Sequence, residues 1–201
     1  MTKVICLTGG LASGKSTAAR FLKEQGAHVI DADLLGHRTY EPGSPAQAQV
    51  VAAFGADVLT EDGKIDRKVL GSKVFGKPEQ LKKLTGIVWP AIRSLAEAEI
   101  ASVKRDGNTA VIVLEAAVLF EAGWEDIGDE VWVNIVDRDV AIARAIARDK
   151  LPQAAVETRL DSQLTNAERT ARAQVVIDNN GSQDQMLTQL RTQWLRVSTG
   201  G

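Results

Sequence analysis

The stretch Gly9-Gly10-Leu11-Ala12-Ser13-Gly14-Lys15-Ser16-Thr17 decides the fold of this chain. It fits the spacing G-x-x-x-x-G-K-[ST], in which a glycine-rich loop holds phosphate groups. Residues 3–8 before it form an apolar run that predicts a buried strand, and residues 17–24 after it predict a helix that stops at Gly26. A phosphate-binding loop requires this order of strand, loop and helix. The sequence therefore predicts a nucleotide-binding protein.

Each part of this loop has a predicted role at the phosphates. Glycines allow a tight turn in which successive backbone N–H groups point into one concavity, and the helix start adds N–H donors with partial positive charge. Lys15 is expected to reach the β- and γ-phosphates, and the Ser16 hydroxyl is the predicted Mg²⁺ ligand. The predicted nucleotide-binding residues of the loop are Gly10, Leu11, Ala12, Ser13, Gly14, Lys15, Ser16 and Thr17. The alternative is a glycine turn without a ligand.

Composition limits the partners and the compartment. The 201 residues suit one domain with inserted lobes, and a net charge of −2 provides no overall basic field for nucleic acid or an anionic membrane. Cys6 is the single cysteine, so no internal disulfide is possible and a reducing cytoplasm is expected. We expect neither a signal peptide nor a membrane span, because no basic leader precedes the loop and no apolar run approaches 18 residues.

Short apolar runs recur between helical patterns along the chain. The runs are rich in β-branched residues and alternate little with polar ones, as in parallel strands that are covered on both faces. They occupy residues 3–8, 27–30, 109–114, 131–136 and 174–177. The pattern predicts an α/β fold: a five-stranded parallel sheet with helices on both faces and its site at the carboxyl ends of the strands. The last helix is expected at residues 183–197.

Two segments lie outside this alternation. Residues 34–107 show no strand pattern but helical runs at 45–54, 66–75 and 78–105, the last with an expected kink at Pro90. We interpret this segment as an inserted helical lobe for the second substrate. The charged segment 148–166 is interpreted as a lid. The sheet core would then comprise about residues 1–33, 108–147 and 167–201 of a single domain.

Two carboxylates, Asp31 and Asp33, close the second predicted strand. If the strand continues that far, a period of two places both on the same side, at the carboxyl edge of the sheet. A kinase needs one carboxylate there to accept the proton of the attacking hydroxyl and another to help hold the metal. The alternative is helix capping, with a helix that begins at Leu34.

Further charged residues suit phosphoryl transfer. Glu115 ends the third apolar strand, where phosphate-loop proteins often place a metal-supporting carboxylate. Arg144 and Arg148 are four residues apart on a helical segment and so share one face, and Arg159 lies in the predicted lid. Arginine stabilises the charge on transferring phosphate oxygens through its planar fork of donors. A solvated helix face is the alternative for each arginine.

Taken together, these residues resemble the dephospho-coenzyme A kinase family over nearly the whole chain. The glycine loop alone is shared by many NTPase families, and the Asp-Ala-Asp and Asp-Gly-x-Ile-Asp-Arg blocks narrow the resemblance to this one. The motifs that carry it are Leu7-Thr8-Gly9-Gly10, Ser13-Gly14-Lys15-Ser16-Thr17, Val29-Ile30-Asp31-Ala32-Asp33, Glu41-Pro42-Gly43, Phe54-Gly55, Asp62-Gly63-Lys64-Ile65-Asp66-Arg67, Leu70, Arg148-Asp149 and Val176-Ile177-Asp178-Asn179-Asn180-Gly181.

Two short segments depart from the bacterial members of this family. The chain has Trp89-Pro90 where they usually have His-Pro, and Glu115-Ala116-Ala117-Val118-Leu119 where they have Asp-x-Pro-Leu-Leu. Both segments are similar to the kinase domain of the bifunctional animal coenzyme A synthase. The sequence is thus a mosaic of the two branches.

The resemblance implies a three-part kinase with ATP and Mg²⁺ on the loop, and adenine near the segment after residues 176–177. The ribose 3′-hydroxyl of dephospho-coenzyme A would attack the γ-phosphate in line, with Asp33 as general base and Asp31 in support. Arg144 would face the transferring phosphate. Catalytic roles are thus predicted for Asp33, Lys15 and Arg144, further nucleotide contacts for Arg148 and Asn179, and acceptor contacts for Thr8, Asp31, Asp33, Arg67, Glu115 and Arg159.

We expect small-molecule substrates only, and a monomer or weak homo-oligomer. One alternative function is another small-molecule kinase of the same architecture, of nucleoside monophosphate or shikimate type. The other is an ATP-binding homologue without catalysis. A GTP switch is disfavoured because the chain lacks an Asn-Lys-x-Asp tetrapeptide.

Overall fold

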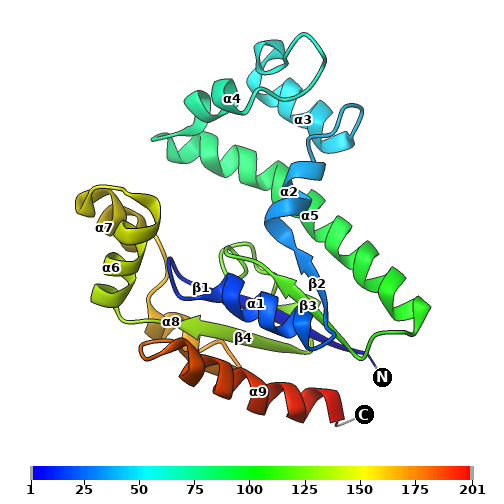
Figure 1. Cartoon of the computed structure of the whole chain (residues 1–201). Helices are drawn as coiled ribbons and strands as arrows, with labels where there is room; N and C mark the ends of the chain where they lie inside the picture. The colour runs from blue at the N-terminus through cyan, green and yellow to red at the C-terminus, as the bar shows by residue number, and fades with distance from the viewer. Residues whose placement is uncertain (1, 200–201) are drawn as a thin grey trace. The chain divides into compact units, whose positions relative to one another are not determined.

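The computed structural model describes residues 2–199 and contains an α/β core (Figure 1). The strands are β1 (Lys3–Gly9), β2 (His28–Asp31), β3 (Val111–Glu115), β4 (Glu130–Ile135) and β5 (Val175–Asp178). The α-helices are α1 (Lys15–Glu24), α2 (Ala32–Arg38), α3 (Pro45–Phe54), α4 (Arg67–Val74), α5 (Pro78–Asp106), α6 (Arg138–Asp149), α7 (Gln153–Asp161), α8 (Asn166–Thr170) and α9 (Gln183–Thr199). Two short 3-10 turns, η1 (Ala56–Val58) and η2 (Glu125–Ile127), complete the elements.

All five strands are parallel and form one sheet in the order β2-β3-β1-β4-β5. The predicted fold class is confirmed. The strand before the phosphate loop, β1, is central and pairs with β3 on one side and β4 on the other. Because carboxyl ends of parallel strands meet at one edge, the end of β1 is flanked there by the ends of both neighbours.

Strand residues alternate between two buried faces of the sheet. Ile5 and Leu7 of β1 pack with apolar residues of α1 and α9, including Leu22 and Leu190, in one fully buried cluster. The neighbouring Cys6 of β1 is also fully buried, and burial raises the pKa of its thiol to about 12. The burial of consecutive residues explains why the strand sequences show continuous apolar runs.

Glu130 connects the sheet to both ends of the described chain. Its carboxylate pairs with Lys3 at 3.1 Å and with Arg196 at 2.6 Å, and it accepts a bond from the Trp132 indole. These donors, with Arg196 the strongest, hold the pKa of Glu130 at about 2. The start of β1 and the last turns of α9 are thereby fixed to the start of β4.

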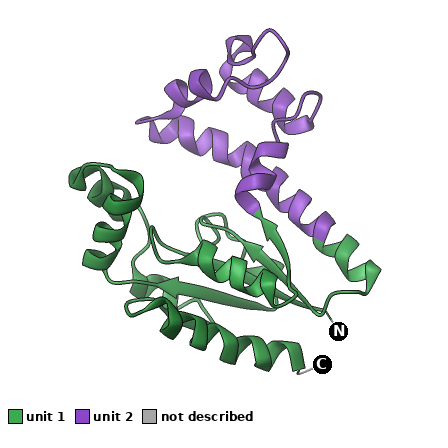
Figure 2. Cartoon of the chain, in the orientation of Figure 1, with its two compact units in different colours: residues 1–31, 100–201 green, residues 32–99 purple. Residues whose placement is uncertain are grey.

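The chain divides into two compact units (Figure 2). Residues 1–31 and 100–201 make up the first, which contains the sheet, and residues 32–99 make up the second. The second unit is helical. Its buried apolar residues include Leu35 of α2, Ile65 of the segment before α4, and residues of α3, η1, α4 and α5: Val50, Phe54, Val58, Leu70, Val74, Val88 and Ile92. Asp66 caps α4 by accepting from the backbone N–H groups of Lys68 and Val69. No strand lies in this unit within the described residues.

One local expectation needs correction. The expected continuation of the second strand to Asp33 is wrong, because β2 ends at Asp31 and α2 begins at Ala32, two residues before the expected Leu34. The strand period therefore does not relate the two carboxylates. The helical run expected at residues 78–105 is present as α5, with the exposed Pro90 inside it, and the expected kink stays a prediction. None of the helices in residues 2–199 is long and apolar enough to cross a membrane.

Candidate active site

The phosphate loop connects the end of β1 to the start of α1 through an unusual backbone path. Ala12 and Gly14 have φ angles of 57° and 87°, in the left-handed region. The loop is closed by a bond from the Ser13 N–H to the Gly10 carbonyl, and α1 begins with the Ala18 N–H donating to the Gly14 carbonyl. A left-handed residue immediately before a helix requires glycine, because other side chains are strained there.

Close packing adds a second reason for the loop glycines. A Cβ on Gly14 would overlap the side-chain amide of Asn179, and a Cβ on Gly9 would overlap the Ser13 hydroxyl. The Asn179 amide donates to the Ser13 carbonyl at 3.0 Å and is 7% exposed. The predicted nucleotide residue Asn179 therefore holds the loop from the side of β5.

Glu115 joins Lys15 and Ser16 at the end of β3. Its Oε1 accepts from Lys15 Nζ at 2.6 Å and from Ser16 Oγ at 3.0 Å, and the residue is 7% exposed. A buried carboxylate with these two donors is stable only while a cation remains beside it. Three side chains predicted separately from the sequence thus form one cluster.

The same cluster offers oxygen ligands for a magnesium ion. Ser16 supplies a hydroxyl and Glu115 a carboxylate, and Mg²⁺ prefers oxygen ligands and is usually held by one or two carboxylates together with substrate phosphates. Residues 2–199 contain no group of three or more His, Cys, Asp or Glu side chains that would hold a metal without a substrate. The donor set fits a metal that arrives with a nucleotide.

Three buried polar atoms, in the loop and in the strands next to it, have no hydrogen-bond partner within the described residues. They are Thr8 Oγ1 of β1, Ser13 Oγ of the loop and Asn134 Oδ1 of β4. Such atoms are rare in folded proteins and are typically completed by a ligand or ordered water. Thr8 is only 1% exposed, and its predicted contact with the acceptor stays a prediction.

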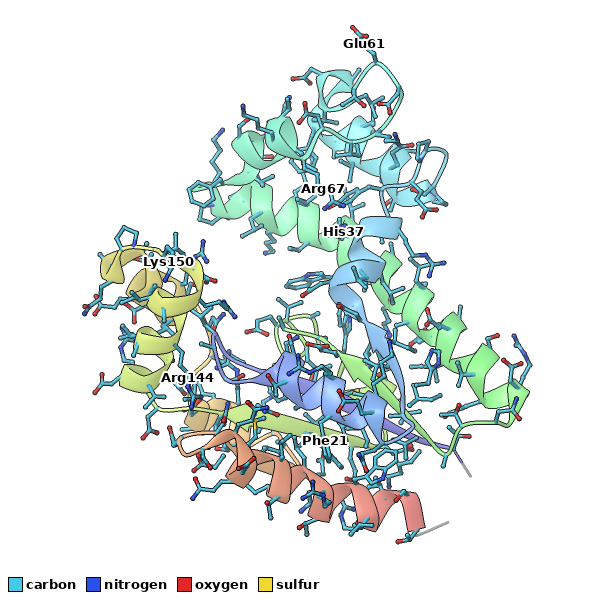
Figure 3. The ribbon with its side chains drawn as sticks, viewed as in Figure 1. Phe21, His37, Glu61, Arg67, Arg144 and Lys150 are labelled. Carbon is cyan, nitrogen blue, oxygen red and sulfur yellow. The ribbon has the colours of Figure 1, made fainter. Side chains whose placement is uncertain are left out.

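Arg144 contacts the segment that follows β5. Its Nη1 donates to the Asn179 carbonyl at 2.8 Å, and its Nη2 to the Gly181 carbonyl at 3.4 Å. Figure 3 labels this residue on α6. The sequence predicted a phosphate contact for Arg144 but not these hydrogen bonds to the backbone of residues 179–181.

The other two predicted arginines lie near the ends of two consecutive helices, Arg148 in the last turn of α6 and Arg159 in the last turn of α7. Arg148 is exposed and pairs with Asp149 at 2.6 Å, which lowers the pKa of the Asp149 carboxyl, and Arg159 contributes to that lowering. Lys150, labelled in Figure 3, ends α6 in the left-handed conformation with φ 56°. The two helices pack together, and an ion pair of 2.8 Å joins Arg138 at the start of α6 to Asp161 at the end of α7.

Asp31 and Asp33 belong to different units. Asp31 is at the end of β2, directly opposite Glu115 in the strand register, so two neighbouring strands end in carboxylates. Asp33 is exposed in the first turn of α2, in the helical unit. A position in the first helical turn is also favourable for a carboxylate on electrostatic grounds alone.

Arg67, the remaining predicted acceptor residue, starts α4 in the helical unit. Its Nη1 lies 3.0 Å from His37 Nε2, and its guanidinium stacks over the Tyr40 ring at 5.9 Å from the centroid. Figure 3 shows the Arg67 and His37 side chains directed toward one another. The sequence analysis did not predict this cluster of three.

The structure also reveals residues at the loop that the sequence analysis missed. A cavity of about 320 Å³ opens beside Gly10 and Leu11, and Gln163 and Arg169 form part of its wall. Gln163 Oε1 accepts from the Leu11 N–H at 3.0 Å. The spacing of Thr165 and Glu168 is typical of a helix cap and predicts only the start of α8. No local sequence pattern indicates that Gln163 and Arg169 lie next to a loop some 150 residues earlier.

Comparison with known proteins identifies the family of the chain. The sequence profile of the family described as dephospho-CoA kinase matches residues 3–185. The chain is 47% identical over 193 residues to a dephospho-CoA kinase of Geobacter sulfurreducens, covering 96% of this chain and 98% of the relative. It is 41% identical over 199 residues to one from Symbiobacterium thermophilum, covering 99% and 82% of the two chains.

Solved structures include proteins that are similar to this chain over nearly its whole length. A dephospho-CoA kinase from Campylobacter jejuni superposes with a TM-score of 0.75 at 27% identity, covering 100% of this chain and 99% of that one. A Thermus thermophilus protein superposes with a TM-score of 0.82 at 29% identity, covering 97% of both chains. Shikimate kinase from Acinetobacter baumannii, with a TM-score of 0.55 at 15% identity over 100% of this chain and 95% of that one, shares the fold alone.

Replacing Gly14 with alanine is expected to weaken ATP binding at least about tenfold, a free-energy loss of about 1.4 kcal/mol. The added methyl group would push Asn179 away from the Ser13 carbonyl and deform the loop. Gly26→Ala is the matched control, because Gly26 also has positive φ, 105°, but has open space around it. Calorimetric titration with MgATP and thermal unfolding of both variants measure the effects.

Both variants are expected to lose about 1–2 kcal/mol of stability from the left-handed backbone. Only Gly14→Ala should lose affinity. Equal ATP dissociation constants for the two variants would show that the contact between Gly14 and Asn179 does not shape the nucleotide site.

Proposed function

This chain belongs to the dephospho-CoA kinase family, and we propose which of its residues carry the phosphate transfer that defines the family. The enzyme transfers the γ-phosphate of ATP to the ribose 3′-hydroxyl of dephospho-CoA, giving CoA and ADP. The observation that supports the assignment of roles most strongly is the cluster of Lys15, Ser16 and Glu115, in which one buried carboxylate contacts two residues of the phosphate loop. Every other assigned role is built outward from this cluster.

The loop residues 10–17 are proposed to hold the phosphates of ATP. Backbone N–H groups would surround the β-phosphate, and the Lys15 ammonium would contact the β- and γ-phosphates. Asn179 would place the loop and lie beside the nucleotide, supported by its contact with the Ser13 carbonyl. Lys15 would then exchange part of its contact with Glu115 for contact with phosphate oxygens.

Ser16 and Glu115 are the proposed holders of Mg²⁺, Ser16 as a direct ligand and Glu115 in support. When bound, the ion supplies neutralisation of the charge on the β- and γ-phosphates. The buried position of Glu115 supports this role, because a carboxylate that releases Lys15 to a phosphate needs another cation beside it.

Asp33 is the proposed general base. Its carboxylate would take the proton of the 3′-hydroxyl while the new O–P bond forms and the bond from the γ-phosphorus to the bridging oxygen of ADP breaks. Asp31 would support its position or the metal. Thr8, Glu115, Arg67 and Arg159 are the further proposed acceptor contacts, and the helical unit, residues 32–99, is proposed to bind the coenzyme.

The arginines are proposed to stabilise charge during the transfer. Arg144 would face the transferring phosphate, and Arg148 would contact the nucleotide from the segment 148–166, which is proposed to act as a lid. Arginine suits this task because its guanidinium presents several donors in one plane. We further propose a cytoplasmic location, which the free, buried thiol of Cys6 supports. The proposed assembly is a monomer or weak homo-oligomer.

An acceptor panel tests the proposed substrate assignment directly. Wild-type protein with MgATP should release ADP in a coupled assay with dephospho-CoA, and not with shikimate or nucleoside monophosphates. Lys15→Ala is the matched control and should lose at least about 90% of kcat, because a tenfold loss corresponds to only about 1.4 kcal/mol of transition-state stabilisation. ADP release with another acceptor in preference to dephospho-CoA would contradict the function.

The substitution Asp33→Asn tests the mechanism. It preserves the size of the side chain but removes the charge that takes the proton, so kcat should fall at least about a hundredfold, within the typical range for a general base. ATP affinity should change little, because Lys15 and Ser16 are untouched. A steady-state assay and MgATP titration measure both effects, with Asp31→Asn as the comparison. The role of Asp33 is contradicted if its substitution leaves turnover unchanged.

A further inference from the structure

Arg169 is a buried cation on the wall of the cavity beside the phosphate loop. It lies on α8, is 4% exposed, and donates from Nη1 to the Leu164 carbonyl. No ion pair joins it to a carboxylate within residues 2–199. A buried charge without a counter-ion is costly, so an arginine in this setting favours an anionic ligand.

Two carboxylates act on Arg169 but do not replace that ligand. Burial lowers the pKa of Arg169, and Glu121 and Glu168 oppose the effect through Coulombic attraction and not through a hydrogen bond. Glu168 is already bonded to the backbone N–H and the hydroxyl of Thr165, each at 2.7 Å. The guanidinium therefore keeps capacity for a further acceptor.

The guanidinium of Arg169 lies beside the phosphate loop. A Cβ built on Gly10 would lie 3.1 Å from Arg169 Nη1 and 3.4 Å from Gln163 Oε1. The same Gln163 oxygen already accepts from the Leu11 N–H. The Gln163 oxygen therefore lies where the Leu11 N–H points, and the Arg169 guanidinium is close by. A phosphate oxygen requires the same arrangement of a backbone N–H and a guanidinium.

The ends of the loop differ in what faces them. Asn179, the proposed neighbour of the nucleoside, packs against Gly14, whereas Arg169 packs against Gly10. With the nucleoside placed beside Asn179, as proposed, the phosphates would extend along the loop toward Gly10. Resting on the proposed function, we propose that Arg169 is a further catalytic residue, whose guanidinium contacts the terminal phosphate of ATP and stabilises its charge during transfer.

In this arrangement a phosphate oxygen replaces Gln163 Oε1 as the acceptor of the Leu11 N–H. The bond from Arg169 to the Leu164 carbonyl holds the guanidinium in place before the nucleotide arrives. A donor that is already oriented costs little reorganisation when charge shifts during the reaction, which is the basis of electrostatic catalysis.

The experiment compares Arg169→Met and Arg169→Lys with the control Arg105→Met, whose arginine is exposed in the last turn of α5. Turnover with dephospho-CoA and the dissociation constants of MgATP and MgADP are measured for each variant. Arg169→Met should lower kcat by about 10²–10³-fold, as loss of one oriented donor to a developing charge does. It should weaken ATP binding and leave ADP binding unchanged, because ADP lacks the terminal phosphate. Arg105→Met should behave as wild type.

Arg169→Lys separates catalysis from folding. It retains the charge but not the planar donors, so it should keep part of the ATP selectivity and lose at least about tenfold in kcat, or about 1.4 kcal/mol. Wild-type turnover in Arg169→Lys together with unchanged selectivity would overturn the proposal, even if Arg169→Met does not fold. An equal loss of ATP and ADP affinity in Arg169→Met would also overturn it.

The two proposals fail in different ways. If wild-type protein does not phosphorylate dephospho-CoA, the proposed function fails. The preference for ATP over ADP then still tests Arg169, because it is measured by binding alone and needs no acceptor.

Discussion

The bond between Lys15 and Glu115 is the interaction on which the site depends. It joins the first residue of α1 to the last residue of β3, at the carboxyl edge of the sheet. Both side chains are largely buried, so separating them without replacement partners would cost about 3–5 kcal/mol, as measured for buried pairs that lose one member. The contact therefore holds the loop closed onto the sheet until a ligand supplies other charges.

The strand order explains why this contact can form. β1 lies between β3 and β4, so the loop after β1 is reached by Glu115 from one neighbour, while the last residue of β1, Gly9, lies opposite Asn134 of the other. Asn179, which follows β5, adds a contact with the Ser13 carbonyl. The loop is thus supported from three strands that are distant in sequence. Its positive φ angles at Ala12 and Gly14 persist because this surrounding structure fixes them.

Sequence patterns predicted the sheet and the loop because both depend on local rules. Continuous β-branched runs mark buried parallel strands, and the glycine spacing marks the loop, so the fold class and residues 9–17 followed directly. The end of β2 was missed because an Asp that ends a strand and an Asp that begins a helix look alike in sequence. Arg169 and Gln163 were missed because they reach the loop only through tertiary packing. Lys15 and Glu115 were each predicted, but their mutual contact was not, since it depends on the register of β1 and β3.

Glu115 balances the charge of Lys15 before the nucleotide binds, and its proposed role afterwards is to support Mg²⁺. The most direct measurement is the dissociation constant of ATP with and without Mg²⁺, by calorimetry, for wild type and Glu115→Gln. Wild-type protein should bind ATP at least about tenfold more tightly with Mg²⁺, a gain of about 1.4 kcal/mol. Glu115→Gln should lose most of that gain while binding metal-free ATP as tightly as wild type or more so, because Lys15 is released. The same gain from Mg²⁺ in both proteins would show that Glu115 does not support the ion.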